Sequence, residues 1–253
     1  MLLHNKVALV TGASRGIGAE IAKQLSAEGA CIFLAAQDSE EALIGVAQQC
    51  RQQSPSAQIA HGGFDFLEDD SSIGVVRAAM EAFGRIDILV NNAAIRVRRP
   101  FGEFSAEEFD QVVAVNLRAP FLISQAVVPI MKVNGAGRII HIASQMGSVA
   151  EQNLALYGLT KAALIHLTMS MAFELASENI MVNAVSPGPT MTEYNVERTS
   201  QHPDYMAHKL AYLPTGRYCR PDEIAEVVRF LATTRASNIQ GHNLVVDGGY
   251  IIH

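Results

Sequence analysis

The chain has 253 residues, of which 49% are hydrophobic and 17% charged, so it can bury the core of one large globular domain and is not a disordered chain. Its net charge of −6 excludes the basic surface that nucleic-acid binding requires. The three cysteines are widely spaced and show no metal-type pairing, and the N-terminus is too short and polar for a signal peptide. No long charge-free apolar run indicates a membrane span. These features predict a cytoplasmic protein.

Short apolar runs alternate along the chain with longer amphipathic stretches, as strands alternate with helices. In chain order, the pattern predicts a strand at 6–11, a helix at 16–29, a strand at 31–36, a helix at 39–53, a strand at 58–64, a helix at 68–84, a strand at 86–93, two helices within 105–133, a strand at 137–144, a helix at 154–178, a strand at 180–188, a helix at 221–233 and a strand at 243–249. Pro129 is expected to kink or tighten the second helix within 105–133. Val, Ile and Leu dominate the strands without polar alternation, which predicts an α/β fold: a doubly wound, seven-stranded parallel sheet with helices on both faces.

One segment, residues 189–215, lacks this pattern and mixes Pro, Thr, His, Tyr and Met with weak periodicity. A loop of this length inside a compact domain is usually functional. We therefore expect a substrate lid at about 189–215 within a single domain that spans residues 1–253.

A glycine-rich stretch, TGASRGIG at 11–18, follows the first strand and opens the first helix. Glycines permit a tight turn and a close approach of the backbone, and the helix N-terminus favours an anion. In this strand–turn–helix setting the stretch predicts a Rossmann-type pyrophosphate site, with an ordinary glycine-rich turn as the alternative. The candidate cofactor-binding residues in it are Gly12, Ser14, Arg15, Gly16, Ile17 and Gly18.

The residues at the end of the second strand bear on the choice of nicotinamide cofactor. An acidic residue there would bind the ribose 2′-hydroxyl of NAD(H) and repel the 2′-phosphate of NADP(H), but Ala36 and Gln37 occupy these positions. Arg15 could pair with such a phosphate. The sequence therefore favours NADP(H), with NAD(H) possible if the carboxylate of Asp38 turns inward.

Several motifs taken together resemble the short-chain dehydrogenase/reductase family over essentially the whole chain. They are TGASRGIG, NNAA at 91–94, Ser144, Tyr157, Lys161, SPG at 186–188 and the terminal VDGGY. The resemblance implies hydride transfer between NAD(P)(H) and a carbonyl or alcohol substrate. It also implies a catalytic set of Asn116, Ser144, Tyr157 and Lys161, in which Asn116 holds a water linked to the lysine.

The spacing of Tyr157 and Lys161 supports this chemistry without the family name. Residues i and i+4 meet on one helix face, and a nearby ammonium lowers the pKa of a phenol, ordinarily about 10, toward the working pH of a general acid or base. A core tyrosine and a turn serine are the alternative interpretation of Tyr157 and Ser144. A non-catalytic dinucleotide-binding sensor is the alternative function, although a sensor has no need of the Ser–Tyr–Lys set.

The resemblance implies further cofactor contacts. Asp65 would meet the adenine amino group or, alternatively, serve as a charge at a helix N-terminus. Asn91 is expected either near the adenine ribose or in a structural role. The remaining expected contacts are Phe66, Asn92, Ala93, Ala94, Pro187, Gly188, Thr190 and Thr192, of which Ala94 stands where the family usually has Gly.

The substrate site is expected at 95–99, at 145–154 and on the lid. Its candidate residues are Arg96, Ser144, Gln145, Tyr157 and Tyr194. The arginines of IRVRRP at 95–100 indicate either an anionic substrate or a solvated rim or subunit interface. A 3-oxoacyl-carrier-protein reductase, a sugar or polyol dehydrogenase and a reductase of small cyclic ketones remain alternatives, and Glu178 weighs against the first because such reductases often place Arg there.

The long apolar helices expected within 105–133 and 154–178 suit an interface between copies of the chain, with packing inside one chain as the alternative. Family members are commonly tetramers, so the resemblance implies a homotetramer.

Overall fold

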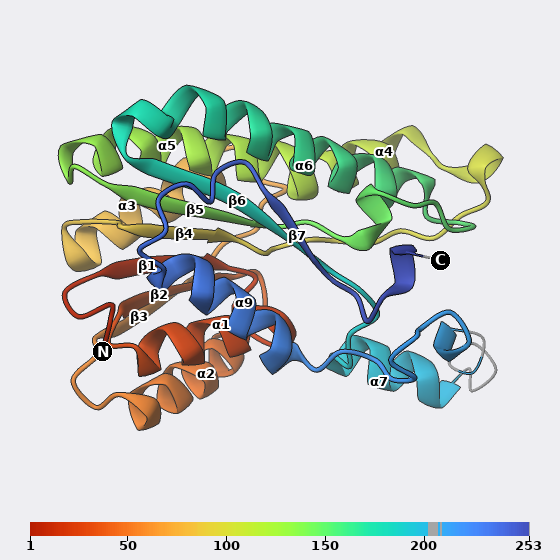
Figure 1. The fold of residues 1–253 in the computed structure, drawn as a ribbon, viewed down its shortest axis with the longest axis horizontal. Coiled ribbons are helices and arrows are strands. Elements are labelled where there is room, and N and C mark those ends of the chain that lie inside the picture. Colours follow the sequence, from red (N-terminus) through yellow and green to blue (C-terminus); the bar gives the residue numbers. More distant parts are fainter. Residues whose placement is uncertain (202–206, 208, 253) are drawn as a thin grey trace.

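The computed structural model describes residues 1–201, 207 and 209–252 and has a three-layer α/β architecture (Figure 1). Seven strands form one sheet in the order β3-β2-β1-β4-β5-β6-β7, and every pair of neighbours is parallel. The strands are β1 Val7–Thr11, β2 Cys31–Ala36, β3 Ile59–Gly63, β4 Ile88–Asn91, β5 Gly137–Ile142, β6 Ile180–Pro187 and β7 Asn243–Val246. The predicted doubly wound sheet is confirmed.

Helices cover both faces of the sheet (Figure 1). On one face lie α1 (Gly16–Ala27), α2 (Glu40–Gln53) and α9 (Pro221–Thr233). On the other lie α3 (Ser71–Phe83), α4 (Ala106–Val113), α5 (Ala119–Val133) and α6 (Ala155–Leu175). Strand order reverses at β1, which pairs with β2 on one side and β4 on the other, so a ligand crevice is expected at the carboxyl ends of these strands.

The strands are apolar on both faces because each face has its own core. All five residues of β1 are buried, and successive side chains point to opposite sides. Ala8 and Val10 pack in the core under α1, α2 and α9, whereas Leu9 packs in the core under α3 and α5. This arrangement explains the absence of polar alternation in the sequence.

The helical stretch 106–133 has its irregularity at a different place from the one expected. Pro129 lies inside α5, which continues to Val133, and the distortion is a π-helix, Ala114–Arg118, between α4 and α5. By length and composition this stretch could cross a membrane, with a mean hydropathy of 1.5. Its apolar face, however, packs in the core through residues such as Ile123, Val127 and Met131. Core packing therefore accounts for part of its apolar character, since 44% of the most apolar window is buried.

The expected lid contains a helix that the sequence did not reveal. Residues 193–201, taken as loop, form α7 (Glu193–Gln201), so the expectation of a segment without secondary structure is wrong. Glu193, Tyr194, Val196 and Glu197 are exposed, so these residues form no buried apolar face by which the helix could be recognised. Residues 202–206 and 208 of the expected lid lie outside the described residues.

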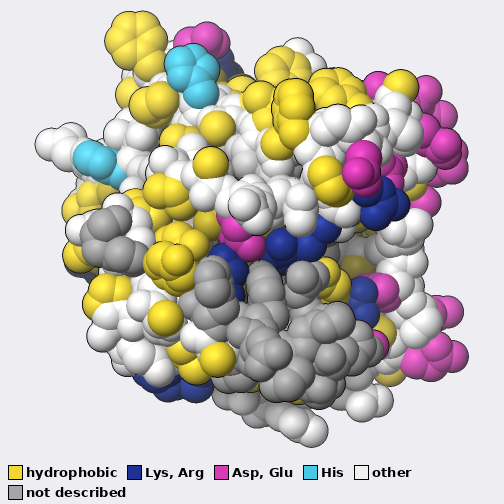
Figure 2. All heavy atoms as spheres, turned by 90° about the vertical axis from the view of Figure 1, so that its right-hand side faces the viewer, with side chains coloured by type: hydrophobic (Ala, Val, Ile, Leu, Met, Phe, Trp, Pro, Cys, Tyr) yellow, Lys and Arg dark blue, Asp and Glu magenta, His cyan; other side chains and the backbone are white. Residues whose placement is uncertain are grey.

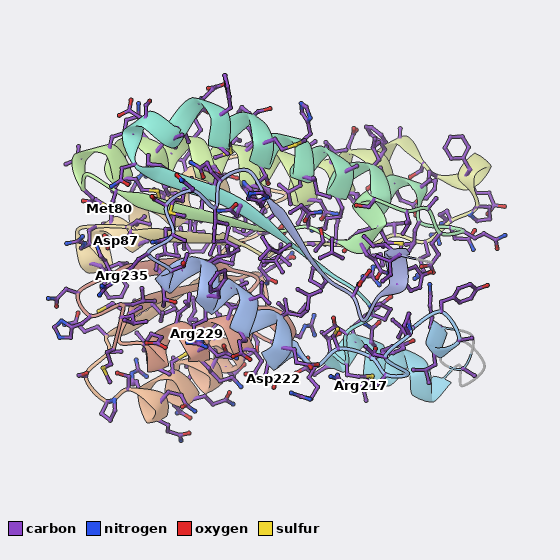
Figure 3. All side chains as sticks on the ribbon, in the orientation of Figure 1. Met80, Asp87, Arg217, Asp222, Arg229 and Arg235 are labelled. Atoms are coloured by element: carbon purple, nitrogen blue, oxygen red, sulfur yellow. The ribbon has the colours of Figure 1, made fainter. Side chains whose placement is uncertain are left out.

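The amino ends of the strands are held by a buried carboxylate, Asp87, far from the crevice (Figure 3). It accepts hydrogen bonds from Lys6 Nζ at 3.0 Å and from Arg85 Nε at 2.8 Å, and from the backbone N–H of Val7 at 3.0 Å. Burial raises the pKa of Asp87, but these donors outweigh it and hold the pKa below its ordinary value. Structural contacts therefore occupy the amino ends of the strands, and a ligand site is expected at the carboxyl ends.

Candidate active site

The glycine-rich stretch forms a tight cradle at the carboxyl end of β1. Gly12 and Gly16 have positive φ angles of 63° and 56°, which favour glycine. A Cβ at Gly18 would lie 2.1 Å from the carbonyl oxygen of Gly12. No side chain caps the amino end of α1, so its first N–H groups face the cradle without an intrahelical partner. These features fit a pyrophosphate group.

Residues that follow β4 brace this cradle. The side chain of Asn92 donates hydrogen bonds to the carbonyl oxygens of Thr11 and Gly12, both at 2.9 Å. The backbone N–H groups of Asn92 and Ala93 donate to Thr11 Oγ1 at 3.0 and 3.1 Å. The Asn92 side chain is therefore committed to holding the loop, and its effect on a cofactor passes through the position of the cradle.

Asn91, at the end of β4, is buried in the core instead of facing the crevice. Its Nδ2 donates to Ser124 Oγ at 3.0 Å and lies 3.2 Å from Nδ1 of His141, a buried residue that the sequence analysis did not single out. Burial, together with the charge of Lys161, lowers the pKa of His141 to about 3, so its ring is neutral. Of the two roles considered for Asn91, these contacts match the structural one.

The residues beyond β2 gather polar groups where the adenosine end of a dinucleotide would lie. Asp38 turns toward the cradle: it accepts a hydrogen bond from Ser14 Oγ and lies 3.6 Å from the guanidinium of Arg15. Gln37 Nε2 donates to Asp65 at 2.6 Å. The side chain of Phe66 is buried in the core, so only its backbone can face a cofactor.

Tyr157, Lys161 and Ser144 come together as expected from their spacing. Tyr157 and Lys161 lie on α6, and Ser144 follows β5 at its carboxyl end. All three are buried, with exposed fractions of 7%, 2% and 7%. Lys161 Nζ donates to the carbonyl oxygen of Ile142 at 2.8 Å and lies 5.7 Å from the centre of the Tyr157 ring.

The surroundings of Tyr157 favour its ionised form. Burial raises the pKa of the phenol, but the positive charges of Lys161 and Arg96 and hydrogen bonds with Arg96 and Ser144 outweigh it, so the pKa lies below 10. Burial and the charge of Arg96 also lower the pKa of Lys161, against an attraction to Tyr157 that raises it. The site thus holds a phenol that can release its proton more readily than a free tyrosine.

Asn116 occupies the π-helix between α4 and α5. Its side chain accepts a hydrogen bond from the N–H of Ile95 at 2.8 Å, and donates to the carbonyl oxygen of Ile95 at 2.9 Å and to Thr160 Oγ1 at 3.2 Å. π-Helical turns are frequent at functional sites. Here the distortion ties the segment after β4 to α6, close to Lys161.

Two adjoining cavities open at these residues. The tyrosine cavity is lined by Ile17, Asn92, Ala94, Tyr157, Lys161, Pro187, Gly188, Thr190, Thr192 and Tyr194, among others. Thr192 lies against the cradle, because a Cβ at Gly16 would come within 3.3 Å of its Cγ2. Most expected contacts of the nicotinamide end therefore share one cavity with the tyrosine and the lysine.

The second cavity, here called the cationic cavity, contains Arg96, Arg98, Gln145, Glu151, Lys209 and Tyr218. The guanidinium of Arg96 lies 4.7 Å from the centre of the Tyr157 ring and 5.9 Å from that of Tyr194. Figure 2 looks onto this edge of the sheet, where basic side chains gather near the centre beside an acidic one. Glu151 and Lys209 fall in segments that the sequence analysis expected at the substrate site, but neither they nor Tyr218 were named individually.

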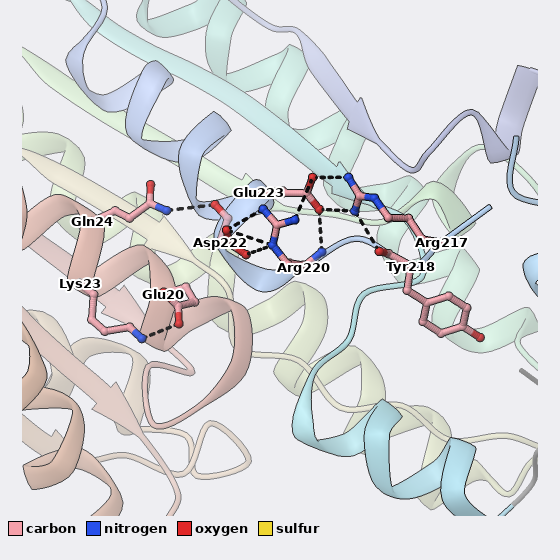
Figure 4. Close-up of polar contacts among 8 residues, drawn as sticks. All are labelled: Glu20, Lys23, Gln24, Arg217, Tyr218, Arg220, Asp222 and Glu223. Carbon is pink, nitrogen blue, oxygen red and sulfur yellow. Dashed lines mark hydrogen bonds and ion pairs between the residues drawn. The ribbon is translucent and has the colours of Figure 1, made fainter. Parts of the chain in front are cut away.

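The segment that carries Tyr218 is anchored at the amino end of α9 (Figure 4). Arg217 pairs with Glu223 through bonds of 2.6 and 2.7 Å, and Arg220 donates to Asp222 at 3.0 Å. Hydrogen bonds from Arg217 and from the Arg220 backbone lower the pKa of Glu223 to about 2. These contacts fix the return from the lid to the core while the Tyr218 ring points away from them (Figure 4).

The fold and this site define a dinucleotide-dependent oxidoreductase, and comparisons with known proteins agree. Residues 12–251 match the family model described as Enoyl-(Acyl carrier protein) reductase. The chain is 37% identical to a 3alpha-hydroxysteroid dehydrogenase of Mediterraneibacter gnavus over 98% of both chains. It is 38% identical to a D-threitol dehydrogenase of Mycolicibacterium smegmatis over 99% of this chain and 94% of the relative.

A solved structure from Beutenbergia cavernae, provisionally assigned as an NAD(P) dependent gluconate 5-dehydrogenase and holding NADP at low occupancy, superimposes with a TM-score of 0.92. It is 31% identical, and the match covers 99% of this chain and 98% of that one. The chain belongs to the short-chain dehydrogenase/reductase family and is an oxidoreductase that uses a nicotinamide dinucleotide and a small-molecule substrate.

The cradle geometry generates a testable prediction. Gly18→Ala places a methyl group 2.1 Å from Gly12 O and 2.5 Å from Asn92 Nδ2, so we expect loss of dinucleotide binding by at least about tenfold, measured by fluorescence titration of the reduced cofactor. Gly45→Ala, in α2 with nothing within 4 Å, is the control and should bind normally. Normal cofactor binding by Gly18→Ala would contradict the assignment of the cradle.

Proposed function

We propose that the protein interconverts a carbonyl compound and its alcohol, with Tyr157 as the proton-exchanging residue and Ser144 as the residue that holds the substrate oxygen. The observation that carries this proposal is the buried phenol of Tyr157 beside two cations, Arg96 at 4.7 Å and Lys161 at 5.7 Å from the ring centre, with Ser144 in the same cavity. A dinucleotide sensor would have no use for such an arrangement.

In the reductive direction, the Tyr157 phenol donates its proton to the carbonyl oxygen as the carbon receives hydride. The nicotinamide, when bound, supplies that hydride or accepts it in the reverse reaction. Lys161 and Arg96 stabilise the phenolate that remains. Asn116, tied to Thr160 and to the Ile95 backbone, positions α6 and is proposed to hold the water through which Lys161 returns the proton.

The residues proposed to hold the dinucleotide follow its length. Gly12–Gly18 would take the pyrophosphate, and the polar groups of Gln37, Asp38 and Asp65 would face the adenosine. The tyrosine cavity would take the nicotinamide, with Thr190 and Thr192 beside it. Residues 189–215 are proposed as the lid of a single domain, with α7 as a helix within it.

The proposal for the cofactor preference changes with the position of Asp38. The sequence favoured NADP(H) on the condition that this carboxylate points away, yet it bonds Ser14 and pairs with Arg15 at the cradle. There the Asp38 carboxylate can bind a ribose hydroxyl and would repel a 2′-phosphate. It also partly neutralises the charge of Arg15. We therefore propose NAD(H) as the preferred cofactor.

The preference can be measured from the Michaelis constants for NADH and NADPH. The native enzyme is expected to favour NADH. Asp38→Asn should shift the ratio of the two Michaelis constants toward NADPH by about tenfold, because it removes the charge that repels the 2′-phosphate and releases Arg15. Asp69→Asn, an exposed carboxylate on Arg118, is the control. A native preference for NADPH would refute this proposal.

We further propose a cytoplasmic homotetramer. The faces of α4, α5 and α6 that point away from the sheet expose large apolar side chains: Phe109, Phe121, Leu159, Met169 and Phe173. Phe173 is 90% exposed, and helix-to-helix burial against a second copy would remove this apolar surface from water.

Light scattering tests the assembly. The native protein should have a mass of about four chains of 27.3 kDa, and Phe173→Asp should lower it because a charge would enter the interface. Leu2→Asp, also at an exposed apolar residue but beside Glu28 just after α1, should leave the mass unchanged. A native mass of one chain would refute the tetramer.

The proton-transfer role is tested with Tyr157→Phe. It should lower turnover by a factor of about one hundred or more while dinucleotide binding persists, because the ring stays and only the hydroxyl is lost. Alcohol oxidation by the native enzyme requires the phenolate, so kcat/KM should rise with pH through the Tyr157 pKa and level off below pH 10. Retained turnover in Tyr157→Phe, or a profile still rising above pH 10, would refute the role.

A further inference from the structure

We propose that the substrate is a small hydroxylated oxo acid, or the corresponding alcohol, whose carboxylate is bound by Arg96 in the cationic cavity. This inference rests on the proposed function and names the substrate class of the same site. The relatives act on compounds as different as a steroid and threitol, so their names do not decide the class.

Arg96 stands where the two cavities meet. It lines both of them, as do Ser144 and Gly188. Its guanidinium lies over the Tyr157 ring at 4.7 Å, on the exposed side of a buried phenol. A substrate whose oxygen lies between Ser144 and Tyr157 must therefore place its neighbouring atoms within reach of this guanidinium. A carboxylate suits it because the guanidinium can donate two parallel hydrogen bonds.

The other charges of the cavity favour a single negative charge. Glu151 lies between Arg98, at 3.3 Å from one carboxylate oxygen, and Lys209, which bonds the other. Arg98 and Lys209 thus share Glu151 as a partner, and the Glu151 carboxylate lies in the same cavity as Arg96. The pKa of Glu151 lies below its ordinary value, so its carboxylate stays ionised. It would repel a doubly charged phosphate more strongly than a singly charged carboxylate.

The remaining lining suits hydroxyl groups. Gln145 is 3% exposed, and its Oε1 has no hydrogen-bond partner among the described residues. A Cβ added to Gly188 would come within 2.9 Å of this oxygen, so Gln145 faces the strand end that both cavities share. A buried acceptor without a partner is unfavourable, and a substrate hydroxyl that donates to this oxygen would satisfy it. A large apolar substrate such as a steroid would bury these groups without partners.

Arg96 also touches Tyr157, so its removal changes two properties at once. Loss of its charge would weaken the ionisation of the phenol for every substrate, charged or neutral. Loss of a carboxylate ligand would weaken only acids. The ratio of the dissociation constants of an acid and its uncharged amide therefore isolates recognition of the carboxylate from the effect on the tyrosine.

The experiment measures short oxo acids of three to six carbons, such as pyruvate and levulinate, and hydroxylated homologues of each, against their amides. Dissociation constants are determined on the enzyme with bound NADH from nicotinamide fluorescence, and kcat/KM from the absorbance of NADH. At least one acid should bind about tenfold or more tightly than its amide, and Arg96→Met should abolish that ratio while Arg96→Lys restores part of it.

The matched control is Arg99→Met. This arginine belongs to the same stretch but pairs with Glu108 at 2.9 Å and lines neither cavity. It should retain the full acid-to-amide ratio. Dihydroxyacetone phosphate, measured against dihydroxyacetone, forms the phosphate arm of the same experiment.

Three results would overturn the inference. The amides could all bind as well as their acids, Arg96→Met could weaken the binding of acids and amides equally, or the phosphate ester could bind more tightly than every acid. Acids that bind through Arg96 to an enzyme that reduces none of the compounds would instead refute the proposed reaction and leave the inference standing. The binding and turnover measurements thus separate the two failures.

Discussion

The site depends on one interaction: a lysine ammonium and a tyrosine phenol buried together one helical turn apart. Burial alone disfavours both charges, raising the pKa of Tyr157 and lowering that of Lys161. Their mutual attraction, with Arg96 as a second cation, reverses the outcome for the phenol. Lys161 is placed for this by its bond to the Ile142 carbonyl at 2.8 Å, so the end of β5 sets the position of the cation.

The surrounding fold serves to bring several strand ends to this pair. Parallel strands place their carboxyl ends at one edge, so Ser144 after β5 and Gly188 after β6 meet residues of β1 and β4 there. The bonds of Asn92 and Thr11 join the ends of β1 and β4 and fix the glycine cradle. In the same way, the side chain of Asn116 in the π-helix joins the segment after β4 to α6. The polar side chains at these positions mostly fix backbone segments that would contact a ligand.

Charged side chains gather in two places along the crevice. Beside the glycine cradle, Asp38 lies 3.6 Å from the guanidinium of Arg15 and partly neutralises it. In the cationic cavity, Arg96, Arg98 and Lys209 lie together with Glu151, which pairs with Arg98 and Lys209. The local field of these groups matters more to a bound ligand than the net charge of −6.

The sequence by itself determined the sheet, its parallel pairing and the meeting of Tyr157 with Lys161, because these follow from local periodicity and from the i, i+4 spacing. It missed α7, whose residues 193, 194, 196 and 197 are exposed, and the π-helix, because Pro129 was the more visible signal. Only the tertiary structure decided the direction of the Asp38 carboxylate and, within the segments expected at the substrate site, the pairing of Glu151 with Arg98 and Lys209. These residues are far apart in the chain or on irregular segments, and their side-chain positions depend on packing that no spacing rule encodes.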